Sequence, residues 1–191
     1  MADVDEAQVR KLVREALERG ERGLAAAPLA ADGPAVVSDA ASRRVAIGSD
    51  HGGYALKEVL KRYVTEELGL EVVDLGTHST EAVDYPDYAA AVAREVANGR
   101  CGRGIVVDSA GIGSTMAANK IAGVRCALCH DAATVLNARE HNDANLLALG
   151  SQVVNRGLAS RMARLFLSTA FGGGRHERRV QKIMALERSG R

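Results

Sequence analysis

Two histidines with acidic neighbours and a pair of arginines are the side chains of this 191-residue sequence that could move protons and hold an anion. His51 follows Asp50 directly, and His141 also stands among carboxylates. A histidine titrates near neutral pH, so each could act as an acid or a base, although single histidines are more often surface or capping residues. Arg175 and Arg179 are four residues apart and would share one face of a helix. Two guanidinium groups on one face suit a phosphate dianion, and a solvated basic face is the alternative. The remaining histidines are expected to be ordinary surface residues: His78, His130 and His176.

A glycine loop offers a second way to bind an anion. It runs from Asp108 to Ser114 through Gly111 and Gly113, after a predicted strand and at the start of a predicted helix. Such a loop can direct backbone N–H groups and the start of a helix at a negatively charged ligand. The dinucleotide-binding pattern G-x-G-x-x-G does not apply, because Met116 stands in place of its third glycine. A tight strand-to-helix turn that binds nothing is the alternative.

Short apolar segments alternate with helical ones from residue 43 onward, and these elements must position the residues above. The predicted strands are 45–49, 71–75, 104–108, 125–129 and 146–149. The predicted helices are 54–68, 88–98, 114–121, 131–139, 158–167 and 175–188. Strands rich in Val, Ile and Leu that alternate with helices predict an α/β fold, with a parallel sheet covered on both faces. Ligands of such sheets bind at the carboxyl ends of the strands.

Composition excludes several classes of protein. Hydrophobic residues make up 47% of the chain, enough for a sizeable core. The net charge of +1 and the aromatic content of 3% argue against a nucleic-acid-binding surface, and no apolar run is long enough to span a membrane. Three cysteines make no disulfide framework, which is typical of a reducing cytoplasm. Cys126 and Cys129 are not expected to bind zinc, because residues three apart in a strand point to opposite faces.

Six segments carry a recognisable pattern: Gly48–Tyr54, Asp84–Pro86, Gly111–Gly113, Ala117–Lys120, Arg139–Asn145 and Gly173–Arg179. In this order they resemble the ribose-5-phosphate isomerase B family, which includes the galactose-6-phosphate isomerase subunits. The resemblance covers residues 43 to 188. It implies a Rossmann-like three-layer sandwich with a five-stranded parallel sheet, and a homodimer whose sites lie between subunits; pairing of dimers into a tetramer is left open. It also implies interconversion of an aldose phosphate with its ketose phosphate, without a metal or other cofactor.

The resemblance assigns the contacts to the substrate. Asp50 and His51 correspond to the pair that holds the sugar and its phosphate. Arg175 and Arg179 correspond to phosphate ligands. The loop residues that correspond to the anion hole for the enediolate are Ser109, Gly111, Ile112, Gly113 and Ser114.

The resemblance also assigns proton transfer. His141 corresponds to the residue that opens the furanose ring, with Asn142 as its substrate-binding neighbour. Many family members use a cysteine as the base where this chain has Asp108, and others use a glutamate where it has Ser114. Because carboxylate bases support this chemistry elsewhere, we hypothesise that Asp108 removes the proton from carbon 2. The alternative is that Asp108 only caps the loop and that isomerase activity is lost.

Two further positions depart from the family pattern. Ala110 replaces a loop threonine, and Gln152 replaces an arginine that contacts phosphate. The predicted reaction is ribose 5-phosphate to ribulose 5-phosphate through an enediolate, a step of the pentose phosphate pathway in carbohydrate metabolism. The alternatives are an isomerase of another pentose, deoxy-sugar or hexose phosphate, and a non-catalytic module that binds sugar phosphates or serves as a scaffold.

The first 42 residues precede the isomerase-like domain, which spans residues 43–191. Within residues 1–22 the apolar positions fall on one face of a predicted helix: Val9, Leu12, Val13, Ala16 and Leu17. Residues 23–42 are rich in Ala and Pro and predict a linker. A helix on such a tether resembles the encapsulation peptides of bacterial microcompartments. It predicts a shell protein or other cargo as partner, and a location in the cytoplasm within a microcompartment. Docking of the helix on its own domain or on the sister subunit is the alternative.

Overall fold

The computed structural model describes residues 40–189. The predicted helix within residues 1–22 lies outside the described residues, as does the predicted linker up to residue 39. The chain enters the domain through a short 3-10 turn, η1 (Ala40–Arg43), which the sequence pattern places mostly in the linker. The Gly102 amide donates a hydrogen bond to Ala41 O at 2.7 Å, so this turn is already joined to the body of the domain.

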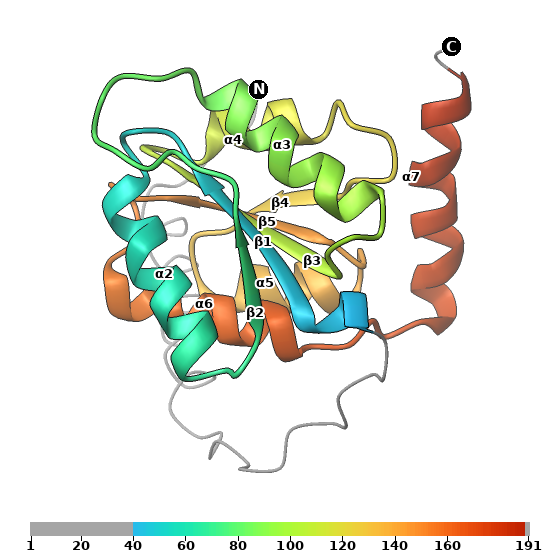
Figure 1. The fold of residues 1–191 in the computed structure, drawn as a ribbon. Helices are drawn as coiled ribbons and strands as arrows, with labels where there is room; N and C mark the ends of the chain where they lie inside the picture. The colour runs from blue at the N-terminus through green and yellow to red at the C-terminus, as the bar shows by residue number, and fades with distance from the viewer. Residues whose placement is uncertain (1–39, 190–191) are drawn as a thin grey trace, which may run out of the picture. The chain divides into compact units, whose positions relative to one another are not determined.

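A five-stranded parallel sheet forms the centre of the domain (Figure 1). Its strands, in sequence, are β1 (Arg44–Ser49), β2 (Glu71–Asp74), β3 (Arg103–Asp108), β4 (Cys126–Leu128) and β5 (Leu146–Gly150). They lie in the order β2-β1-β3-β5-β4, and every neighbouring pair is parallel. All five predicted strands are therefore confirmed, and β3 lies at the centre of the sheet.

Helices cover both faces of the sheet, which confirms the predicted Rossmann-like three-layer sandwich (Figure 1). One face is covered by α2 (Tyr54–Glu66), α5 (Ala132–Glu140) and α6 (Arg156–Ser168), and the other by α3 (Tyr85–Ala97) and α4 (Ile112–Ala118). Alternate residues of each strand enter opposite cores. In β3, Val107 packs with the α2, α5 and α6 side, whereas Val106 packs with the α3 and α4 side.

Cys126 and Cys129 belong to opposite faces of the sheet, as their spacing predicts. Cys126 joins the core beneath α3 and α4, and Cys129 joins the core on the other side. Burial raises the pKa of the Cys126 thiol to about 12 and that of Cys129 to about 11. Both residues are packing residues here, not a metal-binding or redox pair.

Most helix boundaries differ from the prediction by one to three residues, and two of these differences affect the start of a helix near the predicted site. α3 begins at Tyr85, three residues earlier than the predicted start at residue 88, because Pro86 is well suited to the first turn of a helix. The predicted helix 175–188 begins later, since α7 spans Glu177–Ser189 and a separate 3-10 turn, η2 (Gly174–His176), precedes it. Arg175 and Arg179 therefore do not share one continuous α-helix.

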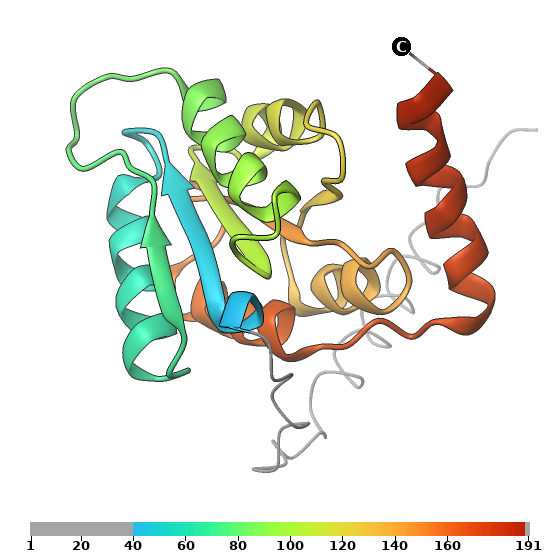
Figure 2. The ribbon, with the colours of Figure 1, turned by 45° about the vertical axis from the view of Figure 1, so that its right-hand side comes forward.

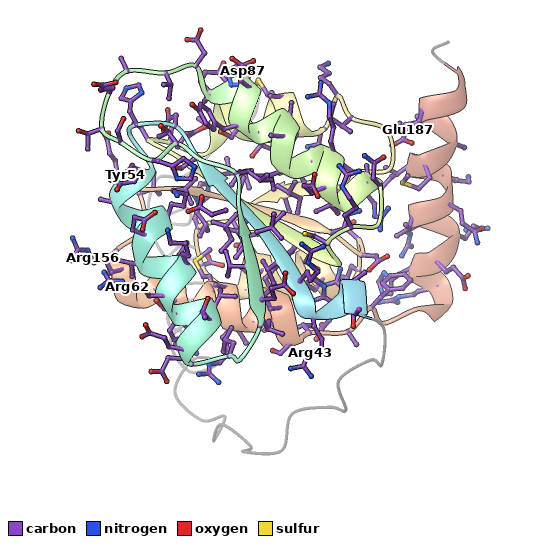
Figure 3. All side chains as sticks on the ribbon, viewed as in Figure 1. Arg43, Tyr54, Arg62, Asp87, Arg156 and Glu187 are labelled. Atoms are coloured by element: carbon purple, nitrogen blue, oxygen red, sulfur yellow. The ribbon has the colours of Figure 1, made fainter. Side chains whose placement is uncertain are left out.

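Parallel strands give the sheet two different ends. All strands finish at its carboxyl end, and each helix that follows a strand returns the chain to the amino end. Figure 3 labels Tyr54, which begins α2 at the carboxyl end, and Arg43, which precedes β1 at the amino end.

The last helix lies at the amino end of the sheet. Figures 1 and 2 both show α7 outside the three layers. Glu187 of α7 accepts a hydrogen bond at 3.0 Å from the amide of Gly123, which precedes β4. None of the helices between residues 40 and 189 combines the length and apolar character needed to cross a membrane.

A buried charge cluster fixes the chain after β2. Lys57 of α2 is fully buried (0% exposed), and its Nζ lies 2.7 Å from Asp74 Oδ1 and 2.9 Å from Glu58 Oε1. Lys61 Nζ lies 2.8 Å from Asp74 Oδ2. Burial acts to raise the pKa of Asp74, but the hydrogen bonds from Lys57, Lys61 and the Gly76 amide outweigh it and lower the pKa to about 2. Gly76 is also hydrogen-bonded to the end of β1. The charge cluster therefore positions the loop after β2 beside the carboxyl end of the sheet.

We predict that Asp74→Asn lowers the free energy of unfolding by about 3 kcal/mol at neutral pH, because it leaves Lys57 buried with one fewer anion. The folded-state pKa of Asp74, about 2, is below its ordinary value of 3.8. Its contribution to stability is therefore present above about pH 4 and is lost as the pH falls toward about 2. Urea unfolding from pH 7 to pH 2 measures this directly.

The matched control is Glu71→Gln, which removes the other acid of β2. Its ion pair with Arg44 is exposed, so the change should stay within about 1 kcal/mol. A stability difference between the wild type and Asp74→Asn that persists undiminished at pH 2 would contradict the assignment to the carboxylate charge.

Candidate active site

The turns after β1, β3 and β5 meet at the carboxyl end of the sheet. The Asp50 amide donates to Val107 O at 3.3 Å, and the Ser151 amide donates to Asp108 O at 2.8 Å. Ser151 Oγ also donates to Gly52 O at 2.7 Å. These bonds connect three turns that carry most of the predicted site residues. We call the set Asp50, His51, Asp108 and the loop Ser109–Ser114 the carboxyl-end cluster.

Asp108 is the last residue of β3 and is only 5% exposed. Its Oδ1 accepts hydrogen bonds from the amides of Ala110, at 2.8 Å, and Gly111. Its Oδ2 accepts from the Ser114 amide at 3.0 Å. A carboxylate has about four acceptor positions, so one position remains on Oδ2. The side chain is held in a single orientation by the loop that it closes.

The glycine loop differs from the predicted anion hole in one respect. Asp108 uses the amides of Gly111 and Ser114, two of those that the prediction assigned to the enediolate, and also the amide of Ala110. Within residues 40–189, the structure gives no hydrogen-bond partner to the amides of Ile112 and Gly113. Gly111 adopts φ +81°, and a Cβ there would lie 2.4 Å from Leu128 Cδ1, so the turn requires glycine. The loop therefore has two amides available for a ligand.

Asp50, the other acid of the carboxyl-end cluster, also accepts a hydrogen bond from the backbone. Asp50 is 7% exposed, and its Oδ1 accepts a hydrogen bond from the Gly53 amide at 2.9 Å at the entrance to α2. His51 is exposed, and its Nδ1 lies 3.2 Å from both the amide N and the carbonyl O of Val83. Val83 belongs to the loop between β2 and α3, so that loop orients the imidazole and leaves its Nε2 side for a ligand.

His141 and Asn142 lie at the other end of the sheet. His141 is the C-cap of α5, a helix that leaves the carboxyl end after β4 and returns to the amino end before β5. Its ring stacks on His176 of η2, with centroids 4.2 Å apart and an interplanar angle of 4°. Arg175 Nε lies 3.4 Å from His176 Nε2. We call His141, Asn142, Arg175, His176 and Arg179 the amino-end cluster.

The charge around His176 is positive. Desolvation lowers its pKa, and the charges of His141, Arg175 and Arg179 lower it further. The pattern of the sequence places His176 among ordinary surface residues, whereas the structure stacks it on a predicted site residue. Its position next to Arg175 in a glycine-rich segment is the signal that could have identified it.

Asp143 holds the turn that carries His141 and Asn142. It is the one described non-glycine residue with positive φ, at 47°. Its Oδ2 lies 2.8 Å from Arg125 Nη2, and its Oδ1 lies 2.9 Å from Arg139 Nη1. Arg139 is only 3% exposed and also donates to Thr169 O and Ala144 O. The two guanidinium groups therefore stabilise a backbone conformation that is costly for a residue with a side chain.

The structure thus places the predicted site residues in two groups. Asp50, His51 and Asp108 meet at the carboxyl end, whereas His141 and Arg175 meet at the amino end. Their positions at opposite ends of the strands prevent them from forming one site within one chain. Gln152 and Ala110, which depart from the family pattern, are both exposed at the carboxyl end. In the described part of the chain, no three His, Cys, Asp or Glu side chains are grouped as ligands for a metal ion.

Comparison with known proteins matches residues 45–183 to the family model Ribose/Galactose Isomerase. Ribose-5-phosphate isomerase B of Escherichia coli is 42% identical over 145 residues, which cover 76% of this chain and 97% of that protein. The solved structure of ribose-5-phosphate isomerase B from Clostridium thermocellum has a TM-score of 0.76 at 46% identity and covers 78% of this chain and 99% of that one. The type B ribose 5-phosphate isomerase of Trypanosoma brucei has a TM-score of 0.74 at 47% identity and covers 76% and 99%. The family match spans both clusters.

We predict that Asp143→Asn lowers the free energy of unfolding by about 2 kcal/mol, because buried Arg139 and Arg125 lose their shared carboxylate. Asparagine tolerates the positive φ at least as well as aspartate, so the loss measures the charge. Asp143→Gly removes the backbone strain as well and should recover part of the loss. Urea unfolding of both variants checks this.

Glu140→Gln serves as the control. Glu140 is an exposed acid in the same turn region whose side chain has no ion pair in the described residues, so its change should be within about 0.5 kcal/mol. Equal stability of wild type and Asp143→Asn would show that the two guanidinium groups do not depend on this carboxylate.

Proposed function

Because this chain belongs to the ribose/galactose isomerase family, we propose that it is a ribose-5-phosphate isomerase that forms ribulose 5-phosphate through an enediolate. The chain is an isomerase, and relatives named ribose-5-phosphate isomerase B are 42–47% identical to it. Within the proposal, each site contains the carboxyl-end cluster of one protomer and the amino-end cluster of its partner in a homodimer.

The chemistry of the two clusters supports this pairing. The carboxyl-end cluster has a carboxylate and two available amides, which suit proton abstraction and a developing oxyanion. The amino-end cluster has two arginines and two histidines, which suit a phosphate dianion and a sugar oxygen. Neither cluster has both functions, so a protomer alone lacks part of the machinery. Exposed apolar side chains near each cluster are available for such an interface: Ile112, Met116 and Val153 at the carboxyl end, and Ile183 and Leu186 on α7.

The orientation of Asp108 is the observation that carries the proposal. Three amides hold the carboxylate, and its remaining acceptor position on Oδ2 can face carbon 2 of a bound sugar. Asp108 removes the proton from carbon 2 and returns it to carbon 1, while the hydroxyl proton of O2 moves to O1. The negative charge that develops on the enediolate oxygens is stabilised by the amides of Ile112 and Gly113. The phosphate binds to Arg175, Arg179 and His51, and His141 and Asn142 contact the sugar ring.

The nearest alternative is a different sugar phosphate. Gln152 stands where the family pattern has an arginine, so one phosphate contact differs, and Ala110 removes a hydroxyl from the loop. A panel of pentose, deoxypentose and hexose phosphates, assayed for ketose formation with and without a chelator, ranks the substrates. Binding without turnover for every sugar would instead favour a non-catalytic module.

We predict that Asp108→Asn lowers turnover of ribose 5-phosphate by about 10²–10⁴-fold, the range expected for loss of a positioned base. Binding of ribitol 5-phosphate, which has no carbonyl and cannot isomerise, should remain measurable. Asp108→Cys should retain more activity than Asp108→Asn, because a thiolate restores a base. Loss of deuterium from carbon 2 of labelled ribose 5-phosphate reports the proton transfer itself.

Asp131→Asn is the matched control for this substitution. Asp131 is also a carboxylate that accepts a backbone N–H, from Thr134 at 2.7 Å, but it caps α5 next to the edge strand β4. Its replacement should leave turnover unchanged. Near-normal turnover of Asp108→Asn would place the base elsewhere.

The extension before residue 40 supports a further part of the proposal, that the enzyme is cargo of a bacterial microcompartment. Its apolar stripe includes Leu12 and Leu17, and an Ala- and Pro-rich segment joins it to the domain. Such a stripe suits a groove on a shell protein or on neighbouring cargo. The alternative occupant is the chain's own domain or the sister subunit.

We predict that residues 1–42 fused to a fluorescent protein form discrete foci when a microcompartment shell operon is expressed in the same cells. Leu12→Glu together with Leu17→Glu interrupts the apolar stripe and should make the fluorescence diffuse, without changing the length of the tether. Diffuse fluorescence of the unaltered fusion would exclude this role for the extension.

A further inference from the structure

We infer that Asn137 is a positioning residue that keeps the ring proton of His141 on Nε2, so that His141 acts as a neutral hydrogen-bond donor. Asn137 lies in the last turn of α5, four residues before His141. Its Nδ2 lies 2.9 Å from His141 Nδ1, and its backbone carbonyl accepts the His141 amide at 3.0 Å. The catalytic consequence rests on the proposed contact of His141 with the sugar ring, whereas the tautomer itself does not.

A backbone carbonyl determines which atom donates in the hydrogen bond between Asn137 and His141. Asn142 Nδ2 lies 3.3 Å from the carbonyl O of Asn137, which can only accept, so this end of the Asn142 amide is the donor. The same Nδ2 lies 3.3 Å from Asn137 Oδ1, which must therefore also accept. The opposite end of the Asn137 amide, its NH₂ group, is left to face His141. Exchanging its O and N would place two donors against each other.

The donor from Asn137 occupies the lone pair of His141 Nδ1. A neutral imidazole has one N–H and one lone pair, so the proton of His141 is then on Nε2. The described residues make no hydrogen bond to that Nε2. The parallel stack on His176 covers a face of the ring and leaves its edge accessible.

The charged groups around His141 leave this tautomer in place. Asp143, two residues later, pairs with Arg125 and Arg139, and in the described residues it makes no hydrogen bond to Nδ1. Positive charge comes from η2 and α7, where Arg175 and Arg179 lie near the stacked His176. Glu140 is adjacent in sequence and exposed. The neutral amide of Asn137 is therefore the group that contacts Nδ1.

A neutral hydrogen-bond donor can stabilise the charge that develops when a furanose ring opens. The bond between carbon 1 and the ring oxygen O4 breaks, the anomeric hydroxyl becomes the aldehyde, and its proton moves to O4 through solvent. Negative charge builds on O4 as the bond breaks, and the Nε2–H of His141 stabilises it. The imidazole ends the step as it began, so no proton has to be returned to it.

The experiment replaces the donor that faces His141 Nδ1 by an acceptor, in the full chain. Asn137→Asp places an acceptor at Nδ1 and should move the ring proton there, which leaves a lone pair on Nε2. Long-range ¹H–¹⁵N spectra distinguish the two tautomers, because protonated and unprotonated ring nitrogens have different shifts. His141 is identified by the signals that disappear in His141→Asn. In the wild type we expect an unprotonated Nδ1 and a protonated Nε2, and in Asn137→Asp the reverse.

Enzyme kinetics test whether the tautomer of His141 affects ring opening. Turnover of ribose 5-phosphate should fall by about 10²-fold in Asn137→Asp, the scale of losing one donor to a developing charge. Turnover of erythrose 4-phosphate, which cannot close a furanose because its O4 carries the phosphate, should change little. Asn98→Leu, which alters an exposed C-cap amide of α3, should change neither spectrum nor turnover.

Two results would overturn the inference. A wild-type spectrum with the proton of His141 on Nδ1 would refute the tautomer, whatever the substrate proves to be. Reversal of the tautomer in Asn137→Asp without loss of turnover on ribose 5-phosphate would refute its use in ring opening. Absence of isomerase activity in the wild type would count against the proposed function and leave the spectroscopic result intact.

Discussion

The direction of the strands is the constraint on which the site depends. In a parallel sheet every strand finishes at one end, and every covering helix finishes at the other. Asp108 ends β3, so it lies at the carboxyl end, whereas His141 ends α5 and must lie at the amino end. No rearrangement of side chains can bring these two residues together within one chain. A site that contains both of them needs a second copy, and oligomerisation would then be part of the chemistry.

In the carboxyl-end cluster, Asp108 has a structural role and, in the proposed mechanism, a catalytic role. Asp108 closes the glycine loop by accepting three amides, and in the proposed mechanism it also accepts the proton from carbon 2. A thiol at this position could not accept three such bonds, because sulfur is a weak acceptor. In the proposed mechanism, aspartate in place of the family's cysteine therefore changes both the base and the group that holds the loop. The oxyanion of that mechanism is then stabilised by the amides of Ile112 and Gly113.

Much of the fold could be predicted because its signals are local. The apolar strands and the helical spacing between them identify every element of the sandwich, and Pro86 accounts for the earlier start of α3. The end of the sheet at which each segment lies also follows from the order of strands and helices. Residue types alone, however, do not show that His141 and Asp108 lie at opposite ends of the sheet. The separation of these two residues follows from the direction of the chain.

Other features depend on contacts between segments far apart in the sequence. In the sequence, Lys57 resembles any surface lysine of an amphipathic helix. Its burial is compensated only because β2 places the carboxylate of Asp74 beside it. His176 joins the amino-end cluster because η2 brings it onto the ring of His141. Asn137 has no motif at all. Its significance comes from the direction of a hydrogen bond, which a carbonyl oxygen of its own backbone determines.

In the proposed mechanism, His141 is a neutral hydrogen-bond donor in the cluster that also binds the phosphate. Arg175 and Arg179 supply positive charge at the amino-end cluster, next to the stacked His176. The carboxylate of Asp143 pairs with Arg125 and Arg139, and in the described residues it makes no hydrogen bond to the ring of His141. An amide is then the natural partner for Nδ1, because it fixes the orientation of the ring without adding charge. In the proposed site, guanidinium groups for the phosphate and a neutral donor for the sugar oxygen are thus two parts of one electrostatic arrangement.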